Sequence, residues 1–427
     1  MRVEDQLIAA HNEQTLPDHR ESFNYLKGRL EKKAIDFHHV IGKIKDFQIA
    51  IPSWALGTGG TRFGRFSGGG EPRTLEEKIE DVGLLHALNR SCGSISLHIP
   101  WDIPGDVPAI QALAASHDLS FDAVNSNTFQ DQSGQPYSYK FGSLCHTDPK
   151  VRQQAIDHNL EVIKYGNALG SKSLTVWLAD GSSFPGQLNF KKAFQRTFAS
   201  LGEIYSGMPK DWKIFIEYKP YEPNFYSTVI QDWGTSHLLA SKLGDQAFSL
   251  VDLGHHLPNT NIEQIVATLM MEGKLGGFHF NDSKYGDDDL TVGSIKPYQL
   301  FLIFNELVEG MEDTTSHNPS PAWMIDASHN LKDPLEDLLQ SIEAIKIAYA
   351  QALLVDRTAL EQARERNDPA LAQEVLQEAY RMDVRPLLAE ARIQSGGTFN
   401  PLVVYRKINV RLQLIKERGE QAVSTGL

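Results

Sequence analysis

Short apolar and β-branched runs alternate with amphipathic helical stretches along most of this 427-residue chain, and this alternation restricts the folds that the chain can adopt. It is typical of βα units around a parallel sheet, because each crossover helix returns the chain to the edge where the next strand begins. We expect eight strands, at Phe47–Trp54, Ser94–Trp101, Ser120–Val124, Ser173–Leu178, Lys213–Tyr218, Phe248–Leu253, Gly277–Asn281 and Ala322–Asp326.

The stretches between these runs are long enough for crossover helices. Helical periodicity is clear in segments 74–90, 148–170 and 261–276, and a closing helix is expected from Pro334 to about Tyr349. Eight strands with such helices fit a (β/α)₈ TIM barrel better than an open doubly wound sheet, which usually has fewer strands and a Gly-rich dinucleotide turn. We therefore predict a barrel over residues 46–353, a helical N-terminal segment over residues 1–45 and a helical extension over residues 354–427. The extension is expected in subunit contacts, with packing on its own barrel as the equal alternative.

The charge balance restricts the partners of the chain. It has 41 Lys and Arg residues against 54 Asp and Glu, a net charge of −13. Nucleic acid and anionic lipid call for a surplus of Lys and Arg on the contacting face, so neither is expected as a partner. No uncharged apolar run approaches the ~18 residues that would span a membrane. Two cysteines and a charged N-terminus without an apolar export segment indicate the reducing cytoplasm.

Polar residues gather where the predicted strands end. Glu217, Asp252, His279 and Asp326 mark the ends of the fifth to eighth strands. In a TIM barrel the working residues lie at the C-terminal ends of the strands. Hard oxygen and imidazole donors on four neighbouring strands are a ligand set for a divalent ion. Any one of them could instead cap a helix, but capping gives no reason for all four to share one rim.

Three further candidate ligands lie close to these strand ends. His255 follows Asp252 by three residues, and Asp287 and Asp289 lie in the loop after the seventh strand. Carboxylates at positions i and i+2 of an extended segment point the same way and can bind one ion, to which Asp252 and His255 could contribute. The sequence therefore predicts a second metal site, although an acidic loop is usually a solvated one.

Two further polar residues are candidates for the chemistry. Lys219 lies two residues after Glu217, so both face the same side of the sheet, and its ammonium either takes part in the reaction or neutralises the acidic rim. His98 ends the second strand, and Asp102 is placed to hold one of its ring nitrogens. Such a histidine could move a proton. The alternative is a histidine hydrogen-bonded at the start of a helix.

Aromatic residues stand at or just beyond several strand ends. They are Trp54, Trp101, Phe129 and Trp177. Aromatic walls suit a small polyol whose C–H faces stack on rings, although core packing is their ordinary role. The Gly-rich segment 57–70 lacks the Lys-Ser/Thr pair of a phosphate loop and the spacing of a dinucleotide turn, so we expect a mobile loop over the first strand.

Taken together, these motifs resemble the L-rhamnose isomerases of the shorter, broad-specificity type, within the xylose-isomerase-like barrels. The resemblance runs over nearly the whole chain and rests on IPSWALGTGGTRFGRF, HIPWD, CHTDP, TVWLADG, IEYKPYEP, VDLGHHLP, HFNDSKYGDDDL and MIDASHN. It implies a structural metal on Glu217, Asp252, His279 and Asp326, and a catalytic metal on Asp252, His255, Asp287 and Asp289.

The same resemblance implies contacts to the sugar and between subunits. It places Trp54, His98, Trp177 and Lys219 at the sugar and brings Phe63 to the active site of a neighbouring subunit. Members of the family are homotetramers that prefer manganese or cobalt and accept several aldoses besides L-rhamnose. We expect L-mannose, L-lyxose, D-ribose and D-allose among them, with Mg²⁺ or Zn²⁺ as further possible ions.

We therefore predict a metal-dependent aldose–ketose isomerase with two divalent ions per subunit. One ion would anchor hydroxyl groups while the other polarises the reacting pair of oxygens. Catalysis is assigned to Lys219, Asp326, His98 and Asp102, and sugar binding also to Phe129. A hydride shift and an enediol route both fit. The alternatives are a ketose 3-epimerase with a single metal, a metal-dependent endonuclease, which the negative charge disfavours, and a non-catalytic sugar-binding barrel.

Overall fold

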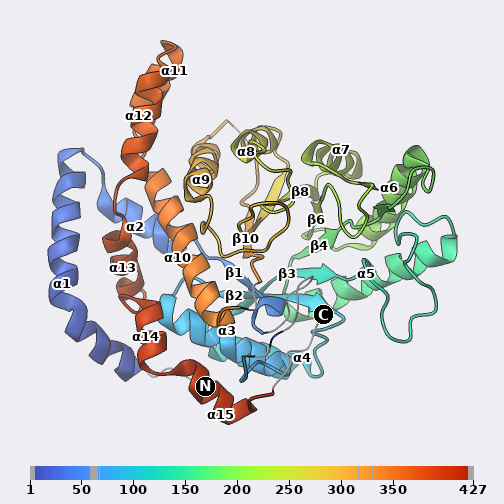
Figure 1. The fold of residues 1–427 in the computed structure, drawn as a ribbon, viewed down its shortest axis with the longest axis horizontal. Coiled ribbons are helices and arrows are strands. Elements are labelled where there is room, and N and C mark those ends of the chain that lie inside the picture. The colour runs from blue at the N-terminus through green and yellow to red at the C-terminus, as the bar shows by residue number, and fades with distance from the viewer. Residues whose placement is uncertain (1–4, 58–65, 67, 316, 329–330, 422–427) are drawn as a thin grey trace.

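In the computed structural model, eight parallel strands close into a barrel in the order β1-β10-β9-β8-β6-β4-β3-β2 (Figure 1). The structure describes residues 5–57, 66, 68–315, 317–328 and 331–421. The barrel strands are β1 (Ala50–Pro52), β2 (Ser94–Ile99), β3 (Ser120–Ser126), β4 (Ser173–Trp177), β6 (Lys213–Glu217), β8 (Ala247–Asp252), β9 (Leu275–Phe280) and β10 (Ala322–Ile325). The predicted TIM barrel is confirmed.

Eight helices of the described chain surround the barrel; seven of them connect its strands, and α10 follows the last strand. They are α3 (Leu75–Asn89), α4 (Val107–Ser116), α5 (Pro149–Leu169), α6 (Phe190–Gly207), α7 (Trp233–Leu243), α8 (Ile262–Met271), α9 (Pro297–Glu312) and α10 (Pro334–Leu353). All but α9 begin after a polar residue whose side chain accepts a hydrogen bond from a backbone N–H of the first turn. These capping hydrogen bonds fix the residue at which each of the seven helices begins.

The other barrel strands differ from the predicted ones by one or two residues at their ends, and two larger departures occur. The predicted strand Phe47–Trp54 contains only the three residues of β1, because Pro52 has no N–H for the ladder and a 3₁₀ turn, η1 (Ser53–Ala55), follows it. A short antiparallel pair, β5 (Gly181–Ser182) with β7 (Ser227–Thr228), was not predicted. This pair joins the loop after β4 to the loop after β6, and the loop after β6 lines the candidate site through Lys219, Glu222 and Pro223.

Aromatic side chains fill the barrel below the site. Phe215 of β6 and Phe248 of β8 form a buried cluster with Ala123 and Leu250. Gly276 of β9 makes room for them, since a Cβ there would lie 2.6 Å from the nearest atom of either ring residue. This cluster fills the barrel interior, and in a TIM barrel the ligand site lies at the C-terminal ends of the strands.

The terminal helices form a second layer beside α10. These helices are α1 (Asp5–Lys32), α2 (Phe37–Asp46), α11 (Arg357–Glu365), α12 (Pro369–Tyr380), α13 (Arg385–Gln394), α14 (Pro401–Lys407) and α15 (Val410–Arg418). Leu30 and Ile41 pack with Leu387, Leu388 and Ala350 in one cluster, so both termini share a core with α10. Helices α11 and α12 project away from the barrel (Figure 1).

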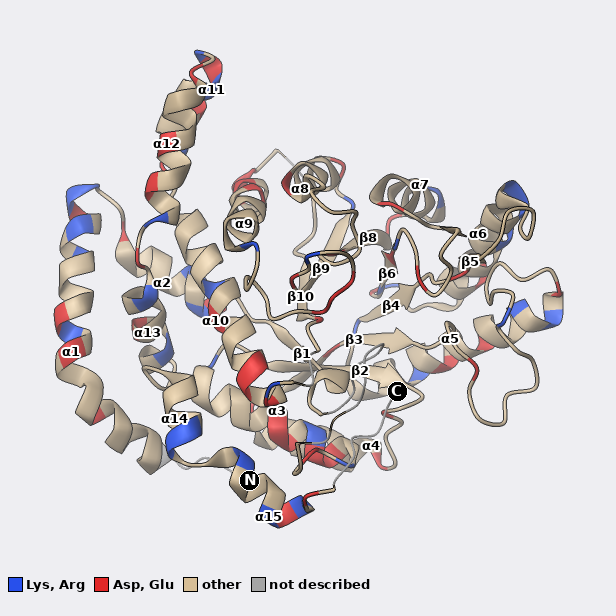
Figure 2. Cartoon of the chain, viewed as in Figure 1, with Lys and Arg blue, Asp and Glu red and all other residues tan. Residues whose placement is uncertain are grey.

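Charged residues are unevenly distributed over the elements, and the helices differ in length and apolarity. Figure 2 shows acidic residues along α3 and along the loop after β9, whereas basic residues are scattered over the outer helices. Of the helices in the described part of the chain, none is by itself long and apolar enough to cross a membrane. The bent pair of α10 and α11, with an angle of 66° between them, meets that test by length and composition only.

Candidate active site

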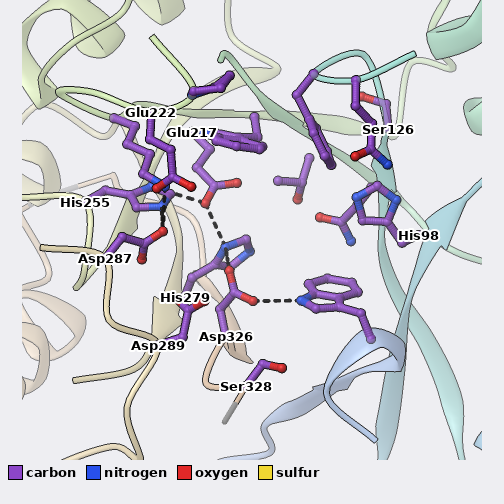
Figure 3. A pocket seen from close by; sticks show the side chains of 18 of the residues that line it. His98, Ser126, Glu217, Glu222, His255, His279, Asp287, Asp289, Asp326 and Ser328 are labelled. Atoms are coloured by element: carbon purple, nitrogen blue, oxygen red, sulfur yellow. Dashed lines mark hydrogen bonds and ion pairs between the residues drawn. The ribbon is translucent and has the colours of Figure 1, made fainter. Parts of the chain in front are cut away.

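A cavity of about 290 Å³ opens at the C-terminal end of the barrel (Figure 3). This volume lies at the lower end of the ~300–1,000 Å³ usual for ligand sites, so the cavity suits a small ligand. Most of the predicted site residues line it, namely Trp54, His98, Trp101, Phe129, Trp177, Glu217, Lys219, His255, His279, Asp287, Asp289 and Asp326. The carboxylates stand on one side together with His255 and His279, and His98 and Ser126 stand on the other (Figure 3).

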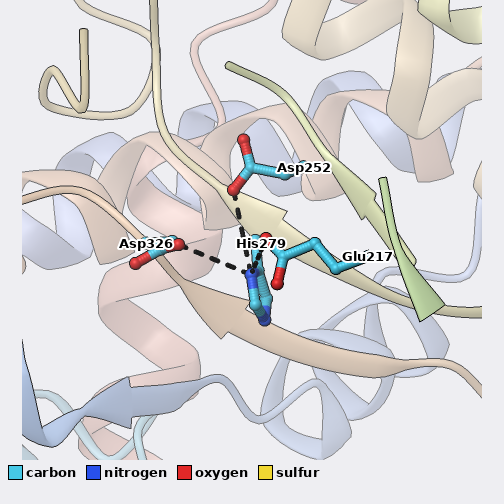
Figure 4. Close-up of side chains that lie close together, drawn as sticks. All are labelled: Glu217, Asp252, His279 and Asp326. Atoms are coloured by element: carbon cyan, nitrogen blue, oxygen red, sulfur yellow. Dashed lines mark hydrogen bonds and ion pairs between the residues drawn. The ribbon is translucent and has the colours of Figure 1, made fainter. Parts of the chain in front are cut away.

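Glu217, Asp252, His279 and Asp326 meet in one cluster (Figure 4), and one ligand atom from each lies within 4.8 Å of all the others. Their strands are neighbours in the barrel, and Asp252 of β8 is in register with His279 of β9. Nδ1 of His279 lies 3.1 Å from Oε1 of Glu217, 3.5 Å from Oδ2 of Asp326 and 3.8 Å from Oδ2 of Asp252. The four predicted side chains therefore converge on one point.

The electrostatics of this cluster fit a cation. Burial raises the pKa of Asp252 to about 7, with Asp287, Asp326 and Glu217 adding to the rise and His255 opposing it. Oδ2 of Asp252 accepts no hydrogen bond from the described residues. Glu217 and Asp252 are buried and Asp326 is partly exposed. Three carboxylates facing one imidazole need positive charge, and hard oxygen and nitrogen donors are suited to a divalent ion. The residues present therefore fit a metal.

A second cluster shares Asp252 with the first. It brings ligand atoms of Asp252, His255 and Asp287 within 4.8 Å of one another. Nε2 of His255 lies 3.4 Å from Oδ2 of Asp287, while Nδ1 lies 3.0 Å from the backbone oxygen of Tyr218, a contact that directs Nε2 towards the carboxylates. Burial lowers the pKa of His255, but Asp252 and Asp287 outweigh it and leave the pKa raised.

The predicted pairing of Asp287 with Asp289 is not observed. Asp289 lines the same cavity but belongs to neither cluster. The pairing argument assumed an extended segment, whereas Asp289 has a φ of +50°, in the left-handed region, so the two carboxylates do not alternate as in a strand. Gly254 leaves room for Asp287, because a Cβ there would lie 2.6 Å from Oδ1 of that residue and would displace its carboxylate.

Lys219 lies between the second cluster and the aromatic wall. Its Nζ donates to Oδ2 of Asp287 at 2.5 Å and to Oε2 of Glu222 at 3.0 Å, and it stands 5.0 Å from the centre of the Trp177 ring. The ammonium of Lys219 therefore lies beside the second cluster, as the sequence predicts. The sequence analysis missed Glu222, which lines the cavity at a φ of +75°. Its spacing of three residues from Lys219 was the available signal.

The predicted contact between Asp102 and the ring of His98 is wrong. Residues 98–102 form a tight turn, in which the backbone N–H of Asp102 donates to the backbone oxygen of His98 at 2.9 Å. The carboxylate therefore accepts from the backbone N–H of His98 at 2.8 Å instead, and also from Nζ of Lys78 at 2.6 Å and from Oγ of Ser53. Asp102 joins β2, α3 and the η1 turn, and it does not line the cavity.

His98 is held by aromatic contacts. Its ring stacks on Trp101 with centroids 4.0 Å apart and meets Trp54 and Phe129 edge to face. Burial lowers the pKa of His98 to about 3, so the ring is neutral near pH 7. Within the described structure its Nδ1 has no hydrogen-bond partner. A neutral ring at this place can exchange a hydrogen bond with a ligand hydroxyl without carrying charge.

The other aromatic residues complete the cavity wall. Nε1 of Trp54 donates to Oδ1 of Asp326 at 2.9 Å, so the indole also orients a carboxylate of the first cluster. The rings of Phe129 and Trp177 lie 4.6 Å apart. Phe63 lies outside the described residues. Polar lining residues that the sequence analysis missed are Asn125, Ser126, Gln130, Thr175 and Ser328.

The chain was compared with known proteins. No protein-family model matches it. It is 51% identical to a probable sugar isomerase of Mesorhizobium japonicum over 97% of this chain and 96% of the relative. It is 53% identical to a probable sugar isomerase of Rhizobium meliloti over 95% of this chain and 94% of the relative.

Solved structures resemble the chain in fold. A protein of Sinorhizobium meliloti 1021 aligns with a TM-score of 0.50 at 12% identity, covering 70% of this chain and 97% of that protein. The apo form of a 3-keto-D-glucoside 4-epimerase from E. coli aligns with a TM-score of 0.49 at 11% identity, covering 66% and 94% of the two chains. At such identities the likeness concerns the fold alone.

Proposed function

Because the chain belongs to the family of these probable sugar isomerases, we propose that it is a metal-dependent aldose–ketose isomerase that interconverts L-rhamnose and L-rhamnulose. The observation that supports the proposal most is the pair of acidic and imidazole clusters that share Asp252 beside a small, partly aromatic cavity. We expect L-mannose, L-lyxose, D-ribose and D-allose as further substrates and a homotetramer as the assembly. Residues 46–353 would form the catalytic unit.

The proposal assigns a divalent ion to each cluster, with Mn²⁺ as the expected ion. Glu217, Asp252, His279 and Asp326 would hold one ion, and Asp252, His255 and Asp287 the other, with Asp289 close by in the cavity. A bound cation would act as a Lewis acid that polarises the sugar oxygens on C1 and C2.

The chain itself would bind and orient the sugar. Moving a hydrogen between C1 and C2 shifts negative charge from one oxygen to the next, and the buried ammonium of Lys219 is placed to stabilise that charge. Trp177 and Phe129 offer faces for the C–H groups of the sugar and exclude water from it. The neutral ring of His98 would hold a sugar hydroxyl or the ring oxygen during ring opening.

A panel of sugars tests this function. Purified protein with Mn²⁺ is incubated with L-rhamnose, L-mannose, D-allose, D-ribose, L-lyxose and D-xylose, and ketose formation is followed with time. We expect L-rhamnose to give L-rhamnulose at the highest rate, and the Asp287→Asn variant to lose most of the turnover. Faster conversion of D-xylose or D-ribose would contradict the substrate assignment. Interconversion of ketoses at C3, without aldose turnover, would favour an epimerase instead.

A further inference from the structure

Asn281 is a buried amide beside both clusters, and the sequence analysis did not single it out. It follows His279 by two residues, just after β9, and is 1% exposed. Its Nδ2 donates to Oδ1 of Asp252 at 2.9 Å and, at 3.4 Å, to the backbone oxygen of Asp326. The amide thus contacts the one carboxylate that belongs to both clusters.

The two oxygens of Asp252 are treated differently by the surrounding chain. Oδ1 accepts from Nδ2 of Asn281 and from the backbone N–H of Gly254, at 2.9 and 2.7 Å. Oδ2 accepts from no described residue and faces Nδ1 of His279 at 3.8 Å. Two donors converging on one oxygen fix the carboxylate plane. The backbone donor alone would not, since either oxygen can accept one N–H when the carboxylate turns.

The position of Asn281 requires an uncharged donor of this size. A carboxylate there would add negative charge to an already acidic cluster, and an aliphatic side chain would donate nothing. Oδ1 of Asn281 has no hydrogen-bond partner in the described chain, so the hydrogen bonds of this side chain are those of Nδ2, to Asp252 and to the backbone of Asp326. A Cβ on Gly254 would lie 3.2 Å from this atom, so the amide also packs on the turn that carries His255.

We propose that Asn281 is a positioning residue that holds the shared carboxylate of Asp252 so that each cluster can bind its cation. This inference rests on the metal dependence in the proposed function and names the residue on which both ions would depend. Partners of metal ligands that act in this way typically contribute 10–100-fold to metal affinity. Because Asp252 is common to both clusters, the loss should appear at both sites.

The test measures Mn²⁺ binding without any sugar. Native protein and the Asn281→Leu variant, each stripped of metal, are titrated with Mn²⁺, and free ion is measured by electron paramagnetic resonance. We expect two bound ions in the native protein and about 10–100-fold weaker binding in the variant. Asn281→Ala, which also lacks the donor but cannot overfill the site, should behave in the same way if Asn281→Leu does not fold.

Asn159→Leu is the matched control. Asn159 is a fully buried amide on α5 whose Nδ2 donates to a backbone oxygen at 2.8 Å and whose Oδ1 also has no partner among the described residues. This variant should keep native Mn²⁺ affinity. The metal-free melting temperature of the Asn281 variants should fall no further than that of Asn159→Leu, because the proposed role is to orient a ligand rather than to stabilise the fold.

The outcomes separate this inference from the proposed function. Native Mn²⁺ affinity in both Asn281 variants, or an equal loss in Asn159→Leu, overturns the positioning role. A native protein that binds two ions but isomerises no aldose contradicts the proposed function, while the variants still decide the role of Asn281. A native protein that binds no Mn²⁺ contradicts both.

Discussion

At the scale of single residues, the ammonium of Lys219 is held between two carboxylates. Asp287 belongs to the second cluster, whereas Glu222 belongs to neither cluster and contacts the ammonium from the loop after β6. An ammonium on the flexible four-carbon stem of a lysine needs such contacts to keep its charge in one place. Glu222 therefore sets where in the cavity the positive charge stands.

The substitution Glu222→Gln tests this positioning. The amide keeps the size of the side chain but removes its charge, so the ammonium should shift towards Asp287. We expect turnover to fall about tenfold, which corresponds to about 1.4 kcal/mol at the transition state. Steady-state kinetics with L-rhamnose and a metal analysis of the same sample give the measurement. The number of bound ions should not change, and a variant that loses an ion would show that Glu222 serves the metal instead.

Contacts set by the order of the strands could be predicted from the sequence, but contacts set by local backbone geometry could not. Glu217, Asp252, His279 and Asp326 could be expected to meet because neighbouring parallel strands bring their ends to one rim. Contacts set by single torsions could not. The turn at residues 98–102 sends the carboxylate of Asp102 to a backbone N–H, and Asp289, at a positive φ, belongs to neither cluster. Neither torsion is encoded in a periodic pattern.

At the scale of elements, helix α15 joins the segment after β1 to the start of α10. Arg411 donates to the carboxylate of Asp333, which caps α10 after β10, and to the backbone oxygens of Gly69 and Gly70 in the segment after β1. The backbone N–H of Gly70 in turn donates to the oxygen of Gly419 at 2.9 Å. The C-terminal helix thereby contacts a segment, at Gly69 and Gly70, that lies more than 300 residues before it in sequence.

A buried ion pair fastens the same helix to α3. Both terminal nitrogens of Arg418 donate to the carboxylate of Asp81 at 2.8 Å, and both side chains are buried. Removing one partner of such a pair costs about 3–5 kcal/mol, because the other charge stays buried without compensation. We expect Arg418→Met to lower the free energy of unfolding by this amount in urea denaturation.

The double variant Arg418→Met with Asp81→Leu is the control for this prediction. It removes both charges and should recover most of the lost stability, because well-packed apolar groups can replace a buried pair at little cost. If Arg418→Met alone is as stable as the native protein, α15 does not depend on this pair. Strand and helix positions of the barrel followed from apolar periodicity, but this link did not, since nothing in the sequence relates Arg418 to Asp81.

At the scale of the whole molecule, the site concentrates negative charge in a chain that is already acidic. The chain carries a net charge of −13, and the two clusters contain four carboxylates, those of Glu217, Asp252, Asp287 and Asp326. Two divalent cations would offset these four charges. A ligand that binds only the folded state stabilises it by about 2.7 kcal/mol at 100 times its dissociation constant. Folding and metal binding should therefore be linked.

Removing the ions is the test of this linkage. Chelation should abolish isomerisation and lower the melting temperature, and added Mn²⁺ should restore both.

The two clusters should differ, because Glu217 stands on a strand end whereas His255 and Asp287 lie beyond the strands, where ligands are held less rigidly. His255→Ala should lose one ion and most turnover at little cost in melting temperature. Glu217→Ala should lose the ion of the first cluster, turnover and most of the stabilisation by Mn²⁺. A His255→Ala variant with two ions and normal turnover would contradict the assignment of two sites, and a melting temperature that does not respond to Mn²⁺ would contradict the linkage.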